Sequence, residues 1–234
     1  MRQTSTLALL RQLGLRGVAK ALRERAWSTH KAFGLAGDLS DIAPARAAKI
    51  EISMEPRDPH EFTGFADELA RVSGDDYIEV DTRIRFCEAG VRELYVAADP
   101  QGRPIYAQWL VDSDNQAALH QAIPEMFPQL ARDEALVEGA YAFVGFRSMG
   151  ALGEGARQLL VKAADKGARR CFTYVSTGNT PALRGVRNAG FDVDHVRVTI
   201  FRGGRRRVQH RPPLPAERAV WEAATAPRPS AATT

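Results

Sequence analysis

The chain has 234 residues, of which 44% are hydrophobic, and a formal net charge of +4 at pH 7. That apolar content is ample for one large domain, or for one domain with appendages. No apolar run approaches the roughly 20 residues of a membrane-spanning helix. The two cysteines, Cys87 and Cys171, have neither metal-ligand spacing nor a disulfide pattern, as is typical of a reducing compartment. We therefore expect a cytoplasmic protein with no metal.

Residues 1–46 are predicted to form a basic extension. Apolar residues between Leu7 and Trp27 are set among arginine and lysine, which is typical of a basic amphipathic helix, although Gly14 and Gly17 weaken the pattern. The segment from Phe33 to Ala48 is rich in Gly, Ala, Asp and Pro and is predicted to be a linker. The helix could pack on its own domain or on a partner subunit in a homodimer. Contact with an anionic membrane surface, with the protein peripheral at the inner membrane, is the alternative.

Residues 47–203 are predicted to form the folded domain. Alternating residues predict strands, and Asp58-Pro59 has the N-cap and first-position proline of a helix. The expected elements are an edge strand at 49–53, a helix from 58 to 70, a less certain segment at 77–89, and an antiparallel hairpin of strands 92–98 and 104–111 around the turn 99–103.

A helical insertion is expected at 113–132, where it should project over one edge of the sheet and wall a substrate pocket. A strand at 135–146 follows, and the strand at 196–201 is expected to be the last of the sheet. Residues 204–234 are basic and rich in Pro and Ala, so we expect a mobile tail. Binding of nucleic acid by its arginines is less favoured than a solvated terminus.

The stretch from Glu138 to Phe191 reads as strand, glycine-bearing turn, helix and strand. The turn is Arg147-Ser-Met-Gly150, directly before the helix. Backbone N–H groups at a helix start have no partner within the helix and carry the positive end of its dipole. The turn is therefore a natural cradle for an anion.

This stretch resembles the GNAT superfamily of N-acyltransferases. The resemblance rests on Arg147-x-x-Gly150, a helix to Gly167, a strand, Asn179-x-x-Ala182 and Gly190-Phe191. It covers about residues 135–200 and extends to residue 49, where the order of strand, helix and hairpin also fits. It implies an α/β (α+β) fold, with a mixed, mainly antiparallel sheet flanked by helices and splayed at an acyl-CoA site.

The resemblance implies acetyl-CoA or another acyl-CoA as co-substrate, with its pyrophosphate at the helix start and Arg147 as a charge-assisted contact. The residues that it assigns to acyl-CoA are Phe143, Val144, Gly145, Arg147, Met149, Gly150, Ala151, Leu152, Gly153, Asn179 and Ala182. Two positions depart from the family. Leu152 stands where a small residue is usual, and Val186 stands where many members have the tyrosine that protonates the leaving thiolate.

In the resembled family an amine attacks the thioester directly, so a general base is needed to deliver the amine neutral. The family often places this base on the strand before the turn. Glu138 is the first candidate and Glu134 the second, because residues four apart on a strand share a face. The reserve candidates are Tyr141, Tyr106 and His120. Cys171 lies within a strand and is disfavoured as a nucleophile.

We therefore expect transfer of an acyl group, most simply acetyl, to an amine such as a sugar amine, an amino acid or a peptide. One alternative is a longer acyl chain, from CoA or from an acyl carrier protein docked on the basic N-terminal helix. The alternative outside enzymes is an acyl-CoA sensor or interaction module that keeps the cradle without the chemistry, which Val186 would permit.

Overall fold

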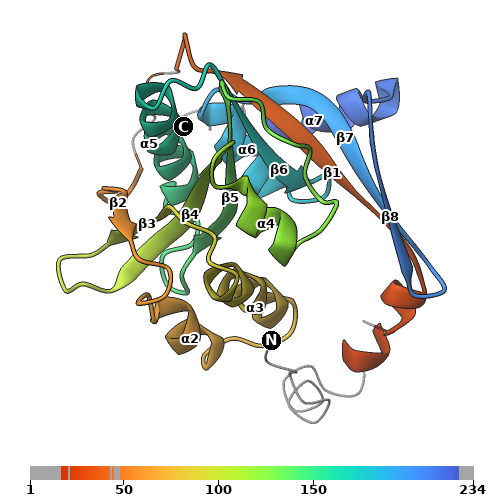
Figure 1. Ribbon diagram of the computed structural model, residues 1–234, viewed down its shortest axis with the longest axis horizontal. Coiled ribbons are helices and arrows are strands. Elements are labelled where there is room, and N and C mark those ends of the chain that lie inside the picture. The colour runs from red at the N-terminus through yellow and green to blue at the C-terminus, as the bar shows by residue number, and fades with distance from the viewer. Residues whose placement is uncertain (1–16, 21, 43, 45–47, 227–234) are drawn as a thin grey trace, which may run out of the picture.

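A computed structural model describes residues 17–20, 22–42, 44 and 48–226. An eight-stranded sheet with the order β2-β3-β4-β5-β6-β1-β7-β8 forms its centre (Figure 1). The strands are β1 (Trp27–Asp38), β2 (Glu55–Arg57), β3 (Leu94–Ala98), β4 (Pro104–Asp112), β5 (Glu134–Ala142), β6 (Arg170–Ser176), β7 (Asp192–Arg202) and β8 (Arg205–Arg211). All neighbouring strands are antiparallel except β5 and β6.

Helices cover both faces of the sheet (Figure 1), and the sheet separates the core into two clusters. The helices are α2 (Gly64–Leu69), α3 (Asp75–Glu88), α4 (Gln116–Ala122), α5 (Ala151–Asp165), α6 (Thr180–Asn188) and α7 (Pro215–Thr225). Buried residues of α5, α6 and α7, such as Leu159, Leu183 and Trp221, belong to one cluster. Those of α2, α3 and α4, such as Phe65 and Val80, belong to the other. The structure is the expected mixed, mainly antiparallel sheet with flanking helices.

The N-terminal segment differs most from the domain boundaries that the sequence predicted. Trp27–Asp38, expected as the end of a helix and the start of a linker, is strand β1 and pairs with both β6 and β7. Phe33 and Leu35 are fully buried within it. The glycines that suggested a linker have a packing role, since a Cβ at Gly34 would lie 2.3 Å from the ring of His195. Of the helix expected before it, the described residues 17–20 and 22–26 are helical, and residues 1–16 lie outside the described chain.

The C-terminal segment is also more ordered than expected. The strand near residue 196 is not the last of the sheet, because Arg205–Arg211 forms the edge strand β8 beside β7. Helix α7 follows and buries Trp221 against Phe33, with ring centroids 6.0 Å apart. Arg205, Arg206, Arg207 and Arg211 lie in this paired strand and not in a solvated run. The expectation of a mobile tail from residue 204 is therefore wrong as far as residue 226.

Two early elements also differ from expectation. Residues 49–53 form no strand. The side-chain amide of Gln158 on α5 takes the place of a partner strand: its Nε2 donates to Ile52 O at 2.7 Å, and its Oε1 accepts from Met54 N at 2.9 Å. The edge strand is β2, just beyond. Asp58 accepts from His60 N at 2.8 Å in a local turn, so the helix starts at Gly64 instead.

Glu217 fastens α7 to the sheet. Its carboxylate accepts from Lys31 Nζ of β1 at 2.7 Å and from Arg211 of β8 at 2.7 and 2.8 Å, and its side chain is 9% exposed. These hydrogen bonds, led by those from Arg211, hold its pKa far below the usual range. Because the pKa is depressed on folding, the stabilisation is present above the ordinary carboxylate pKa of 4.5 and is lost as the pH falls below it.

Replacing Glu217 by glutamine is expected to destabilise the fold by about 2 kcal/mol, the scale of hydrogen bonds to charged groups, because two cations lose their shared partner. Urea unfolding at pH 7 measures the loss, and it should shrink at pH 3. Glu222 on the outer face of α7 is the matched control, and Glu222→Gln should change the free energy of unfolding little. Equal effects of the two substitutions would contradict this assignment.

Candidate acyl-CoA and acyl-transfer site

Strands β5 and β6 run parallel for only a short distance and then part. Their ladder contains Glu134↔Arg170, Ala135↔Cys171 and Leu136↔Phe172, and no pair beyond these. Both strands continue, to Ala142 and Ser176 respectively. Past Leu136 the two edges therefore face each other across a gap, and backbone groups there are not used by a ladder between these strands.

A groove of about 780 Å³ lies at the open end of this gap. The N-terminal residues of α5 and α6 form much of its wall, so two positive helix ends and their N–H groups converge on it. Eight of the residues that the sequence assigned to acyl-CoA line it, namely Arg147, Met149, Gly150, Ala151, Leu152, Gly153, Asn179 and Ala182. An anionic ligand is the kind that such a groove favours.

The turn before α5 has the backbone of an anion cradle. Ser148 and Gly150 both lie in the left-handed region, with φ of 63° and 87°. A Cβ at Gly150 would meet Ala48 at 3.1 Å, so glycine is required here for conformation and for space. The chain turns sharply enough for α5 to begin at Ala151, directly against the groove.

The larger residue at position 152 is accommodated by a glycine on the neighbouring helix. A Cβ built on Gly185 would lie 2.5 Å from Leu152 Cδ2. The leucine side chain therefore occupies the space that a side chain at position 185 would take, and the α5 turn keeps its course. Val186 is 3% exposed in the core, so this position supplies no proton donor.

Arg147 is held at the groove by three partners. Its guanidinium donates to Asp76 Oδ2 at 2.9 Å, to Tyr141 Oη at 3.2 Å and to Ala142 O at 3.3 Å. Tyr141 in turn donates to the buried Glu68 at 3.1 Å, and burial followed by Glu68 raises the pKa of Tyr141 to about 12. Tyr141 lines the groove but stays protonated, so it orients Arg147 rather than acting as a base.

Glu138 lies just beyond the last β5–β6 pair, at a bulge in β5. The register against β4 shifts between Ala107 and Trp109, and Gly139 takes a φ of 69° with Trp109 packed against it. Burial raises the pKa of the Glu138 carboxyl, while the charges of Arg197 and Arg83 act in the opposite direction.

Atom Oε2 of Glu138 is buried and has no hydrogen-bond partner among the described residues. A buried carboxylate oxygen without a partner is costly, which marks it as a position where a ligand group could bind. Arg83 of α3 and Arg197 of β7 were not predicted, because no local pattern marks them as neighbours of Glu138. Arg83 binds three backbone oxygens, those of Glu79, Gly139 and Ala140, and so buttresses the bulge.

Several predicted site residues lie elsewhere. Phe143, Val144 and Gly145 do not line the groove: Phe143 stacks on Phe65 with centroids 5.6 Å apart, and Val144 points outward with 52% exposure. Of the reserve candidates, Tyr106 is fully buried and donates to Gln108 at 2.8 Å, and His120 lies on α4. Cys171 is buried, which raises the pKa of its thiol to about 12 and opposes a role as nucleophile.

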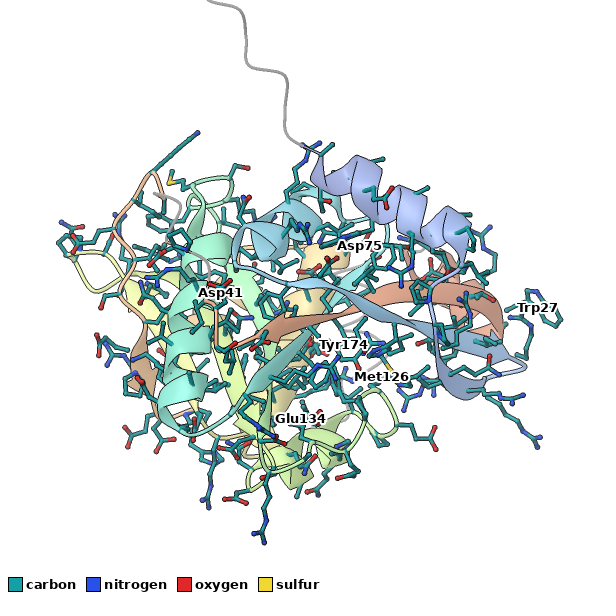
Figure 2. The ribbon with its side chains drawn as sticks, turned by 90° about the horizontal axis from the view of Figure 1, so that it is seen from above. Trp27, Asp41, Asp75, Met126, Glu134 and Tyr174 are labelled. Carbon is teal, nitrogen blue, oxygen red and sulfur yellow. The ribbon has the colours of Figure 1, made fainter. Side chains whose placement is uncertain are left out.

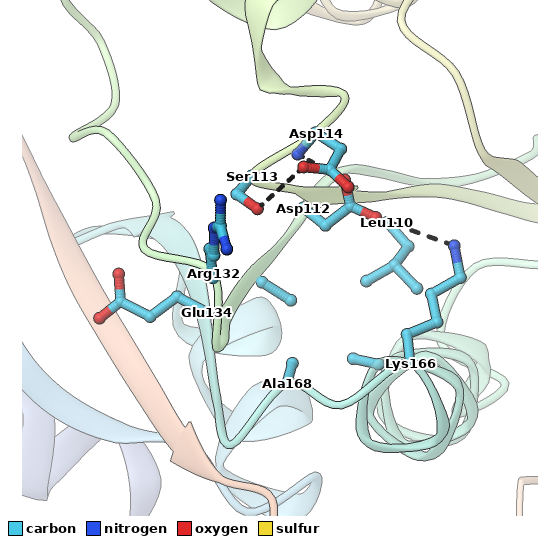
Figure 3. A pocket seen from close by; sticks show the side chains of 10 residues that line it. Leu110, Asp112, Ser113, Asp114, Arg132, Glu134, Lys166 and Ala168 are labelled. Atoms are coloured by element: carbon cyan, nitrogen blue, oxygen red, sulfur yellow. Dashed lines mark hydrogen bonds and ion pairs between the residues drawn. The ribbon is translucent and has the colours of Figure 1, made fainter.

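Glu134 is at the opposite end of β5 from the groove. It lines a separate pocket of about 80 Å³, where Lys166 and Asp112 pair at 3.9 Å (Figure 3). Its Oε2 accepts from Ala131 N at 3.0 Å. The parting of the strands therefore selects Glu138 over Glu134 as the base candidate.

Comparison with solved structures decides the fold. The chain superposes on a GCN5-related glucosamine N-acetyltransferase region of a fungal multi-domain GH3 beta-N-acetylglucosaminidase with a TM-score of 0.56 and 17% identity, over 83% of this chain and 22% of that one. The fold is that of the GNAT superfamily. A GNAT-family acetyltransferase from Colwellia psychrerythraea also matches, with a TM-score of 0.48 and 16% identity, over 85% of this chain and 62% of that one.

No model of a known protein family and no curated protein matched the chain. The chain spans about a fifth of the fungal protein and under two thirds of the Colwellia GNAT protein. Within the described chain, no helix has the length and apolar character to cross a bilayer. The same residues contain no group of three or more His, Cys, Asp or Glu side chains that could hold a metal.

Proposed function

We propose that the protein is an N-acyltransferase that moves an acyl group, most simply acetyl, from CoA to an amine. The observation that carries this proposal is the parting of β5 and β6 beside a groove walled by two helix N-termini, with the unpaired oxygen of Glu138 next to the gap. In this proposal the groove would hold the pyrophosphate end of an acyl-CoA, and the gap would hold its extended thioester arm.

Residues of the α5 turn would bind the co-substrate. Backbone N–H groups from Gly150 onward and the Arg147 guanidinium supply the positive groups that a pyrophosphate needs. Asn179 caps α6 by accepting from Ala182 N at 3.2 Å, so its role is to fix the second helix end at the groove.

Glu138 would act as the general base. The amine nitrogen attacks the thioester carbon while Oε2 of Glu138 takes a proton from that nitrogen. Burial favours this role, because a pKa raised from 4.5 brings the carboxylate closer to the working pH of the enzyme. Backbone N–H groups on the parted edges would stabilise the oxyanion.

The acceptor is proposed to be a sugar amine, an amino acid or a peptide. The fungal GNAT region named above is described as a glucosamine N-acetyltransferase, so glucosamine is the first acceptor to test. A cytoplasmic location, a homodimer, and docking of the N-terminal basic helix on a membrane surface or an acyl carrier protein stay predictions.

The test is release of free CoA thiol from acetyl-CoA in the presence of a panel of glucosamine, amino acids and short peptides. We expect release that depends on one class of amine, with CoA binding measured separately by calorimetry. If CoA binds and no amine gives thiol release, acyl-CoA of longer chain and acyl carrier protein are tried as donors. Binding of CoA without turnover on any donor would favour the sensor, and absence of CoA binding would overturn both.

Replacing Arg147 by alanine is expected to raise the Kd for CoA about 10- to 100-fold, because a charge-assisted hydrogen bond to phosphate is worth about 1.5–3 kcal/mol. Calorimetry with CoA measures the change. Arg169→Ala is the matched control, since Arg169 pairs with Asp133 at 2.7 Å at the other end of β5 and β6. Equal loss of affinity in both variants would show that general charge, and not position, matters.

A further inference from the structure

Glu138 lies on the face of the sheet opposite to the one on which α5 packs. It pairs with Trp109 of β4, and residues directly opposite each other in an antiparallel pair share a face. Trp109 belongs to the buried cluster of α2, α3 and α4, whereas the buried residues of α5 belong to the other cluster. An amine that reaches Glu138 therefore has its surroundings on the α3 side, where the nearby charged side chains decide which amine fits.

Two arginines act on Glu138, and only one of them is fully engaged. Arg83 donates to three backbone oxygens, and its Nη2 lies 3.9 Å from the carboxylate of Glu79, which balances its charge. Arg197 forms no ion pair with any residue that the structure describes, Glu138 included. Burial raises the pKa of Glu138 and lowers that of Arg197, and in each case the opposite charge of the other residue is the next cause, acting against burial. Glu138 and Arg197 are therefore close neighbours that do not touch.

Two aromatic rings and one carbonyl hold the Arg197 guanidinium in a fixed orientation. Its Cζ lies 4.5 Å from the ring centroid of Tyr174 and 5.3 Å from that of Phe127. Its Nη1 donates to Met126 O at 3.0 Å, and Tyr174 and Met126 are labelled in Figure 2. The N–H donors of Nε and Nη2 have no partner among the described residues. A guanidinium held in this way is prepared to bind a carboxylate through parallel N–H···O bonds.

The strand register brings this guanidinium towards the gap. Leu136 of β5 pairs with Phe172 of β6, so two residues further along the parallel strands Glu138 and Tyr174 occupy corresponding positions on the two edges. Arg197 comes from β7, but its guanidinium lies over the ring of Tyr174 and so reaches back over β6. The unpaired Oε2 of Glu138 and the free donors of Arg197 thus belong to the same neighbourhood.

We propose that the amine acceptor is a free amino acid, whose ammonium group binds Glu138 and whose carboxylate binds Arg197. The inference rests on the proposed transferase function and names the acceptor class for the same site. A negative and a positive side chain that are close without touching match the two charges of a zwitterion. The transfer would yield an N-acyl amino acid, CoA thiol and one proton, because the ammonium loses two protons and the thiolate takes one.

An amine without a carboxylate is a poor match for these side chains. Glucosamine arrives as a cation, and it would lie beside the Arg197 guanidinium without supplying the anion that this group lacks. A buried charge that is left without a partner is costly, so the site should disfavour such an acceptor. Glucosamine, already in the acceptor panel, is therefore the contrasting substrate in this proposal.

The test measures release of CoA thiol from acetyl-CoA with matched acceptors. A panel of free α-amino acids is compared with the amides of the same amino acids and with glucosamine. The amides lack only the negative charge, and their amines are less basic, so chemical reactivity alone would favour them. We expect kcat/KM for the best amino acid to exceed that for its amide about 10- to 100-fold, the scale of hydrogen bonds to charged groups.

Substitutions at Arg197 test whether this residue causes the preference. Arg197→Met removes the charge and keeps an unbranched side chain between Phe127 and Tyr174, so kcat/KM should fall for the amino acid and not for the amide. Arg197→Lys keeps the charge without the planar fork and should retain only part of the preference. Arg202→Met is the matched control, because Arg202 lies on the same strand with its Cζ 4.1 Å from the ring centroid of Trp27. It should keep the wild-type preference.

The outcomes separate the acceptor class from the reaction. Thiol release that is as fast with amides, short peptides or glucosamine as with free amino acids would overturn the amino-acid assignment and leave the transferase intact. A preference that survives in Arg197→Met would do the same for Arg197. A wild-type protein that releases no thiol with any acceptor or donor would overturn the transferase and its acceptor together. The wild-type panel needs no substitution, and the ratio between two acceptors does not depend on the fraction of a variant that is folded.

Discussion

Glu138→Gln is expected to lower kcat about 1000-fold, within the range for loss of a general base, with little change in the Kd for CoA. Glutamine keeps the size of the side chain but cannot take the amine proton. CoA binding should survive because Glu138 does not line the groove. Steady-state kinetics with calorimetry measures both quantities, and a variant that keeps wild-type kcat would remove Glu138 from the mechanism.

The dependence of kcat/KM on pH, and a control substitution at Glu134, test the role of Glu138 further. Glu138 acts as a base only when ionised, so kcat/KM should fall as the pH drops through its pKa, which burial places above 4.5. The acid limb should disappear in Glu138→Gln. Glu134→Gln, on the same strand but in the separate pocket of Figure 3, is the matched control and should keep both the rate and the limb.

Phe33→Ala is expected to cost about 4 kcal/mol of stability, as is typical of a large aromatic side chain removed from a close-packed core. Phe33 is fully buried in β1 and packs edge-on against Trp221 of α7. A loss of this size is a large part of the stability of an ordinary domain. Urea unfolding followed by circular dichroism would measure it.

Trp27 provides a control on the same strand. It lies at the outer end of β1 (Figure 2) and is 70% exposed. The Cζ of Arg202 is 4.1 Å from the centroid of its ring. Trp27→Ala should therefore cost less than about 1 kcal/mol. If Phe33→Ala were as mild as Trp27→Ala, β1 would be the linker that its composition suggested.

The sequence predicted the elements whose signals are local. The hairpin of β3 and β4, the helix α5 and the strand β6 are confirmed, because a turn, a glycine and an apolar alternation mark each one. Strand β1 was missed because Gly34 and Gly37 are poor strand residues, and they are tolerated here through packing against residues far along the chain. Strand β8 was missed because its arginines resembled a solvated run.

The candidate site also contains residues that local sequence predicts and residues that only the fold brings together. The cradle around Gly150 was predictable, because the helix start and the glycine that precedes it are adjacent in sequence. Glu138 could be ranked above Glu134 only once the parting of β5 and β6 was known. The contact between Tyr174 of β6 and His195 of β7, 2.9 Å between Oη and Nε2, was not predictable either, because it depends on the absence of a side chain on Gly34 in a strand that was itself missed.

The position of β1 also bears on how the protein is made. Its partners, β6 and β7, are synthesised more than 130 residues later, since Ala32 pairs with Ser176 and Arg197. On the ribosome the first strand must wait, with its apolar residues uncovered, until nearly the whole chain has emerged. Folding that needs such distant contacts is slow and exposed to aggregation. We expect shortened chains that end before β7 to be recovered as insoluble protein.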